Sequence, residues 1–230
     1  QGYFAQHDFQ ITGSVPSLPP APGSSSSQPP TNQTKSGCFI ATATYGSEAA
    51  PQVQALRDFR DGIAMKTFAG SSFMQGFLTW YYSWSPPVAY SIAPNDNARA
   101  VMRVALQPIL DILQVATATF STLSFSGEFA IIAAGFVAAA LIGLIYMTPS
   151  VTLVLLWLRR SMRGATLPKA SQALYLTAIP WAASIVLIAL AELFMASPLM
   201  VVATLAFVTL TILMVVSTTS LWLAGLRLKR

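Results

Sequence analysis

The chain has 230 residues, of which 54% are hydrophobic and only 9% are charged, and its net charge is +5. Because about a quarter of the residues of a soluble globular domain are charged, this composition excludes an ordinary soluble domain and predicts a membrane protein. More than half of the lysines and arginines border apolar runs, which is typical of membrane topology and argues against a nucleic-acid partner.

The first segment, residues 1–37, is predicted to be extended, since from Gly13 onward it consists largely of Pro, Ser, Gly, Asn, Gln and Thr. Such a stretch buries too little apolar surface to offset an ordering cost of roughly 1–2 kcal/mol per residue. The chain starts at Gln1 without a basic n-region or an apolar h-region, so we expect a mature chain whose signal peptide has been cleaved. The N-terminus is therefore expected outside the cytoplasm.

A small helical domain is predicted over residues 38–120. Its first helix is expected over 51–68, where apolar residues recur at spacings of three and four. Arg57 and Asp61 lie four residues apart on it, so we expect an exposed ion pair between them that contributes about 0.3–0.5 kcal/mol. Gly62 is expected to weaken this helix.

The second helix is predicted over 72–84 and is rich in aromatic residues. The sequence Ser85-Pro86-Pro87 is expected to break the chain after it, and a short element is expected over 88–93. Aromatic side chains at helical spacing are mostly core residues or membrane-interface anchors, and we favour these roles over a pocket for a cofactor or pigment.

The third helix is predicted over 96–117, with Asn95 or Asp96 as its N-cap. Its polar residues follow one narrow stripe: Arg99, Arg103, Gln107, Asp111, and Gln114 or Thr117. Two placements fit this pattern, namely burial against the aromatic helix and a position along the membrane surface with the apolar side down. We favour burial, because so narrow a stripe leaves too much apolar face for one contact with a bilayer.

Residues 38–47 have the sequence CFIATATYGS, which resembles the CFI-box, whose usual form is CFIATAAYGS. The resemblance continues through residues 53–61 and 81–89 to about Leu110, so it covers under half of the chain. It implies a small extracytoplasmic domain of the kind found on bacterial and archaeal surface proteins, without an established activity. The family motif positions that it points to are Cys38, Phe39, Ile40, Ala41, Thr42, Tyr45, Gly46, Arg57, Arg60, Asp61, Tyr82, Ser85 and Pro86.

Cys38 is the only cysteine, which excludes an intrachain disulfide, and His7 is the only histidine. These counts argue against a zinc, haem or copper site built by this chain alone. We favour a buried, apolar Cys38. The alternatives are a covalent group attached to it, such as a cofactor or lipid, and nucleophilic catalysis, which needs a base to generate the thiolate. Because His7 lies far upstream, we expect that the protein is not an enzyme.

Residues 121–230 are predicted to form three transmembrane helices, over about 129–158, 174–195 and 199–223. Cations without acids follow the first span and close the chain: Arg159, Arg160, Arg163, Lys169, Arg227, Lys229 and Arg230. By the positive-inside rule, this loop and the C-terminus face the cytoplasm, and the domain before the spans lies outside it. Ionisable residues are nearly absent from the spans, which argues against transport.

Together these features predict a mainly α protein, with a small helical extracytoplasmic domain plus three transmembrane helices in the cytoplasmic membrane. We expect a non-catalytic accessory or structural subunit of a larger bacterial membrane complex, whether respiratory, photosynthetic or secretory, because the spans carry small residues suited to helix packing. The expected partners are other membrane-protein subunits and the lipid bilayer, and no cofactor is assigned. The alternative is a membrane-anchored surface module that bears a covalent group on Cys38.

Overall fold

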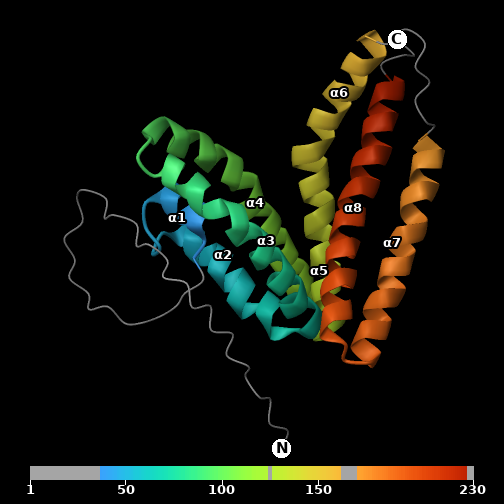
Figure 1. The fold of residues 1–230 in the computed structure, drawn as a ribbon, viewed down its shortest axis with the longest axis horizontal. Helices are drawn as coiled ribbons and strands as arrows, with labels where there is room; N and C mark the ends of the chain where they lie inside the picture. The colour runs from blue at the N-terminus through green and yellow to red at the C-terminus, as the bar shows by residue number, and fades with distance from the viewer. Residues whose placement is uncertain (1–36, 124–125, 162–169, 227–230) are drawn as a thin grey trace, which may run out of the picture. The chain divides into compact units, whose positions relative to one another are not determined.

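The computed structural model describes residues 37–123, 126–161 and 170–226, which all fall in one compact unit, Ser36–Arg230. Within these ranges the backbone is helical or irregular and forms no strand, so the predicted mainly α fold is confirmed. The predicted extended segment lies outside the described residues, except for Gly37. Figure 1 shows the helices with their labels.

Two short helices open the described chain. The first, α1 (Phe39–Tyr45), ends at Gly46, whose backbone has the left-handed conformation (φ 79°) that glycine adopts most easily. The second, α2 (Pro51–Gly62), has proline at its first position, where the missing N–H costs no helical hydrogen bond. It is followed by the 3-10 helix η1 (Ala64–Lys66), so the predicted continuation of this helix to Phe68 is wrong.

The aromatic helix α3 (Phe68–Ile92) runs without a break through Pro86-Pro87, so the predicted break and the separate short element after it are wrong. Each proline removes the N–H that would bond the carbonyl four residues earlier, which usually ends or kinks a helix. Here tertiary packing holds the turn that follows, since Ala89 and Ile92 are buried in one cluster with side chains of α1.

The fourth helix, α4 (Asp96–Thr122), begins at a predicted N-cap, since the Asn95 side chain accepts a 3.1 Å hydrogen bond from the Ala98 N–H. It packs mainly along α5 (Gly127–Ile142) and against α1, and it touches α3 only slightly, so the predicted burial against the aromatic helix is wrong. The main core instead joins side chains of α3, α5, α7 and α8. One face of α4 therefore stays exposed.

The longest apolar segment contains a local change of helix type. Helix α5 passes into five π-helical residues, η2 (Gly143–Met147), and then into α6 (Thr148–Ser161). The change lies just before Pro149, whose missing N–H leaves a carbonyl of the preceding turn without its usual partner. The Thr148 hydroxyl donates a 3.0 Å hydrogen bond to the Gly143 carbonyl. The helix thus accommodates Pro149 with a π turn in the preceding residues.

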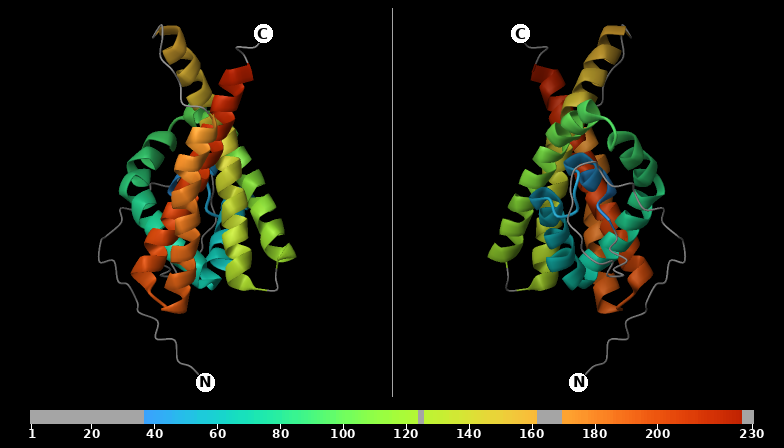
Figure 2. Two further views of the ribbon diagram at one scale, coloured as in Figure 1. Left: turned by 90° about the vertical axis from the view of Figure 1, so that its right-hand side faces the viewer. Right: turned by 90° about the vertical axis from the view of Figure 1, so that its left-hand side faces the viewer.

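The last two helices form an antiparallel hairpin. Helices α7 (Ala170–Leu193) and α8 (Ser197–Leu226) lie side by side along their length (Figure 2). Helix α8 also contacts α3, α5 and α6, so it is the central helix of the bundle. The Trp181 indole N–H donates a 2.9 Å hydrogen bond to the Thr211 hydroxyl, which ties α7 to α8.

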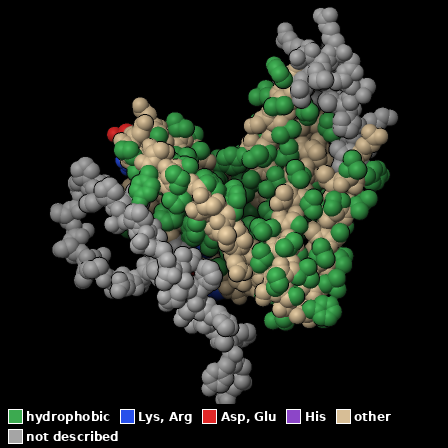
Figure 3. All heavy atoms as spheres, viewed as in Figure 1, with side chains coloured by type: hydrophobic (Ala, Val, Ile, Leu, Met, Phe, Trp, Pro, Cys, Tyr) green, Lys and Arg blue, Asp and Glu red, His purple; other side chains and the backbone are tan. Residues whose placement is uncertain are grey.

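Four segments of the described chain, rather than the three predicted, are long and apolar enough to cross a membrane. Three match the predicted spans, and the fourth is α4: Asp96–Thr122, Gly127–Trp157, Leu174–Leu193 and Ser197–Leu223. Helix α4 qualifies because its charges gather near its start and only Asp111 carries charge over residues 104–122. On the face shown in Figure 3, charged side chains lie over α1–α4 and not over α7 and α8, as expected of a membrane-embedded bundle.

Candidate functional site

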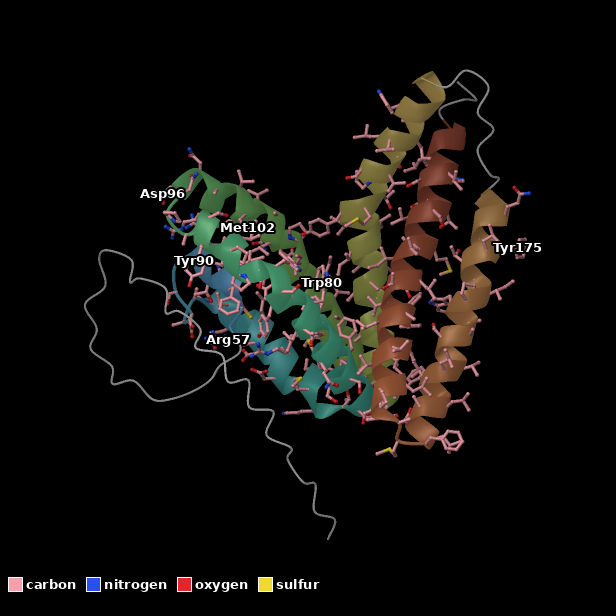
Figure 4. The ribbon with its side chains drawn as sticks, viewed as in Figure 1. Arg57, Trp80, Tyr90, Asp96, Met102 and Tyr175 are labelled. Carbon is pink, nitrogen blue, oxygen red and sulfur yellow. The ribbon has the colours of Figure 1, made fainter. Side chains whose placement is uncertain are left out.

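Predicted motif residues from three helices converge beside Cys38. The rings of Phe39 and Tyr82 meet edge to face with their centroids 5.5 Å apart. Cys38 itself lies within electrostatic reach of three charged residues of α2. We call this group the Cys38 cluster, and its members are Cys38, Phe39, Arg57, Arg60, Asp61 and Tyr82. Figure 4 labels Arg57 on α2, the helix that contributes all of the charge.

The Cys38 thiol lies at the start of α1 and is half-buried, whereas a buried cysteine was predicted. Burial raises the pKa of this thiol above its usual value, and the guanidinium groups of Arg60 and Arg57 lower the pKa by less than burial raises it. The thiol is therefore protonated at neutral pH, which is unfavourable for nucleophilic catalysis.

Arg60 and Asp61 form a bidentate ion pair within the Cys38 cluster. The Nε and Nη2 atoms of Arg60 donate to the two carboxylate oxygens of Asp61 at 2.7 and 2.9 Å. These hydrogen bonds lower the pKa of Asp61 and raise the pKa of Arg60. The predicted pair between Arg57 and Asp61 is wrong, because the fork of the neighbouring Arg60 binds both carboxylate oxygens at once.

Arg57 is the other buried guanidinium of the cluster and is only 8% exposed. Its Nη2 lies 3.0 Å from a carboxylate oxygen of Glu48, in the loop between α1 and α2. The two groups are not aligned for a hydrogen bond, so Nε and Nη2 of Arg57 have no hydrogen-bond partner in the described part of the chain, and both atoms are shielded from solvent. The buried charge is thus paired, but two of its donors are not.

Tyr81, which the sequence analysis did not single out, connects α1 to α3. Its hydroxyl accepts a 3.1 Å hydrogen bond from the Ile40 N–H, one of the first amides of α1, which have no partner inside the helix. Burial of the Tyr81 side chain raises the pKa of its hydroxyl, which stays protonated. Ser85, one turn further along α3, is fully buried. The four-residue spacing of Tyr81 and Ser85 is a signal that could have placed both on the face toward α1.

The other predicted motif residues lie on α1, at its end, or on α3: Ile40, Ala41, Thr42, Tyr45, Gly46, Ser85 and Pro86. Ile40 packs with Phe39 in one hydrophobic cluster. At the far end of α1, the Arg99 Nε of α4 donates a 3.4 Å hydrogen bond to the Thr44 carbonyl. A Cβ at Gly46 would lie 2.9 Å from the Arg99 Nη2. Glycine is thus favoured at Gly46 by its positive φ, whereas the guanidinium of Arg99 can shift to admit a Cβ.

A second polar site, which the sequence analysis missed, joins α3 to α5. Glu128, in the first turn of α5, accepts hydrogen bonds from the Phe68 and Ala69 N–H groups at the start of α3. The Thr67 hydroxyl accepts a 3.1 Å hydrogen bond from the Gly70 N–H. One residue of α5 thus caps another helix whose start lies 60 positions earlier, a distance over which no local spacing could have indicated the contact.

Within the described ranges, no group of three or more His, Cys, Asp or Glu residues is placed to hold a metal ion. Comparison of the chain with protein-family models, curated proteins and solved structures gives no match. The resemblance to the CFI-box family therefore stays a prediction, and the candidate site rests on the geometry of the Cys38 cluster alone.

Proposed function

We propose that the protein is a non-catalytic accessory subunit of a larger bacterial membrane complex, in which a partner subunit covers the exposed face of α4. Large apolar and polar side chains alternate on that face: Val101, Arg103, Val104, Gln107, Asp111 and Val115. Val101 and Val104 are 70% and 76% exposed. Water is a poor solvent for the valines, and hydrocarbon is a poor solvent for the charges. A protein surface can offer both apolar contacts and hydrogen-bond partners.

The position of α4 along the bundle is the observation that carries this proposal. Helix α4 runs antiparallel to α5 and packs along it, and the Tyr146 hydroxyl donates a 2.6 Å hydrogen bond to the Ala105 carbonyl. If α5 crosses the membrane, the apolar part of α4 lies at the same depth. Asp111 accepts a 3.1 Å hydrogen bond from the Gln107 side chain on the same exposed face, and it would then face hydrocarbon unless another subunit covers it.

The orientation that we propose follows from the cations and from the ends of the α3–α4 hairpin. The positive-inside rule places the basic loop after α6 and the C-terminal tail in the cytoplasm. Glu128 holds the start of α3 next to the start of α5, so the α3–α4 hairpin begins and ends on the same side of the membrane. The hairpin therefore crosses the membrane either not at all or twice. The three crossings by α5–α6, α7 and α8 then place the starts of α3 and α5 outside the cytoplasm. With no crossing by the hairpin, which is the arrangement that we propose, the Cys38 cluster lies outside the cytoplasm as well.

Native mass spectrometry after mild detergent extraction tests the subunit proposal. We expect the chain in a complex with a second polypeptide at a fixed ratio. The variant V104E is expected to release the partner, because it buries an unpaired carboxylate in the contact. S91E, at an exposed position of α3, is the matched control. A chain that is monomeric before any substitution contradicts the proposal, and so does equal release by both variants.

Protease digestion of sealed right-side-out vesicles tests the orientation separately. We expect the protease to cut within the part before α5 and to spare the basic loop after α6. Cleavage of that loop together with protection of the part before α5 would reverse the orientation without affecting the subunit proposal.

A further inference from the structure

Two arginines of α2 lie in the same environment but differ in their hydrogen bonds. Arg57 and Arg60 are 8% and 9% exposed, and both lie beside Cys38. Arg60 uses its Nε and Nη2 to bind both oxygens of Asp61. Arg57 has the same two atoms buried and without a hydrogen bond in the described part of the chain. This edge of a guanidinium is the one that binds carboxylate or phosphate through two parallel hydrogen bonds.

We propose that this open edge of Arg57 is a binding site for an oxyanion, a carboxylate or phosphate group, held beside the Cys38 thiol. Buried donors without partners are rare, and each one left unsatisfied costs free energy that a ligand would recover. A single oxyanion fits the requirement, because it supplies two acceptor oxygens to one fork. The half-buried Cys38 thiol lies next to the bound group and can donate a weak hydrogen bond to it.

Glu48 is the competing occupant of this edge, and its geometry argues against that role. Its carboxylate comes within 3.0 Å of one Arg57 nitrogen without the alignment of a hydrogen bond. The Glu48 side chain is 59% exposed, so water solvates it well without Arg57. Asp61, the other nearby acid, is already held by Arg60. In the described part of the chain, the fork of Arg57 thus has Glu48 and the Cys38 thiol beside it but no aligned acceptor oxygen, and a group from outside the described residues can supply one.

The oxyanion can come from free phosphate or from the headgroup of an anionic phospholipid, since both offer the same phosphate oxygens. The single cysteine makes Cys38 a selective reporter of either source. We use the neutral disulfide 4,4′-dithiodipyridine, which forms a mixed disulfide with the thiol and releases pyridinethione. Because the reagent carries no charge, its rate reports access to the thiol rather than attraction by the arginines.

The experiment measures the labelling rate of the full chain in neutral detergent, with phosphate or chloride at equal ionic strength. We expect saturating phosphate to slow labelling roughly tenfold, because an ion held by two parallel hydrogen bonds to Arg57 covers the neighbouring thiol. The R57K variant keeps the positive charge but loses the fork, so phosphate should slow its labelling less than about twofold. K66Q removes an exposed cation of η1 and is the matched control, with the full tenfold protection expected.

Equal labelling rates in phosphate and in chloride overturn the proposal, and so does full protection in R57K. Circular dichroism verifies that R57K is folded. If it is not, E48Q serves instead, because removal of the competing carboxylate should let phosphate protect at lower concentration, and unchanged or weaker protection counts against the site. Nanodiscs without free phosphate separate the sources. Because phosphatidylcholine also carries a phosphodiester, the reference is the R57K variant in the same nanodiscs. Labelling that phosphatidylglycerol nanodiscs slow in the unchanged protein but not in R57K assigns the site to a lipid headgroup, and equal labelling of the two proteins assigns it to free phosphate.

Discussion

Replacement of Glu128 by alanine is expected to loosen the start of α3 and to lower the free energy of unfolding by about 2–4 kcal/mol. The carboxylate accepts two hydrogen bonds, from the Phe68 and Ala69 N–H groups, in a partly buried position. Two hydrogen bonds to a charged group contribute about 3–6 kcal/mol together, and partial hydration of the freed amides lowers the expected loss to about 2–4 kcal/mol. The negative charge also interacts favourably with the positive N-terminal ends of both α3 and α5.

Two measurements verify this expectation. Thermal unfolding in detergent micelles, followed by circular dichroism, gives the change in stability, with D58N at an exposed position of α2 as the control. Hydrogen exchange of peptides that cover residues 64–72 gives the local effect, and we expect faster exchange there in E128A and not in D58N. If E128A melts at the same temperature as the unchanged protein and exchange over residues 64–72 stays the same, Glu128 does not cap α3 in solution.

Three further predictions concern glycine, an ion pair and an interhelical hydrogen bond. G70A is expected to destabilise the protein by about 1–3 kcal/mol, because its Cβ would lie 2.3 Å from the Ala64 carbonyl oxygen. G62A, which meets nothing within 4 Å, is expected to be neutral or stabilising, and equal melting of the two variants would contradict the close approach. The hydrogen bonds from Arg60 lower the pKa of Asp61 in the folded state. The ion pair therefore stabilises the protein at pH values above about 3.9, the pKa of Asp in the unfolded chain, and this stabilisation is lost as the pH falls through the lower pKa of the folded state. The melting difference between the unchanged protein and D61N should therefore be present at pH 6 and shrink below about pH 4, whereas a constant difference would exclude the pair. W181F is expected to lower the free energy of unfolding by about 0.5–1.5 kcal/mol, because it removes the hydrogen bond to Thr211. In a double-mutant cycle T211V should lower it little further in the W181F background, and fully additive effects would mean that the bond is absent.

Local rules of helix termination predicted several boundaries in the first half of the chain. Asn95 was identified as a candidate N-cap, and its side chain does accept from Ala98. Pro51 was placed in the first turn of its helix and lies there. These positions depend only on neighbours within a few residues, so the sequence alone contains the information.

The prolines of α3 show where local rules fail. Proline chemistry predicted a break after Trp84, and the helix continues through Pro86 and Pro87 to Ile92. The turn after the prolines is buried against α1, more than forty positions earlier, so its stability comes from contacts that no local pattern contains. The three predicted spans, by contrast, followed from length and apolar composition alone. The same two properties also qualify α4 as a span, and whether α4 lies in the membrane depends on its packing along α5.

The ion pairs of α2 explain why the candidate site could be located but not resolved from the sequence. The resemblance put Arg57, Arg60 and Asp61 among the motif residues, and all three do lie beside Cys38. The four-residue rule assigned Asp61 to Arg57, because it considers only which side chains share a helix face. The adjacent Arg60 binds Asp61 instead, since its fork meets both carboxylate oxygens. Because Asp61 pairs with Arg60, Arg57 is the guanidinium with donors that form no hydrogen bond. The chemistry of the site therefore depends on which of the two arginines pairs with Asp61.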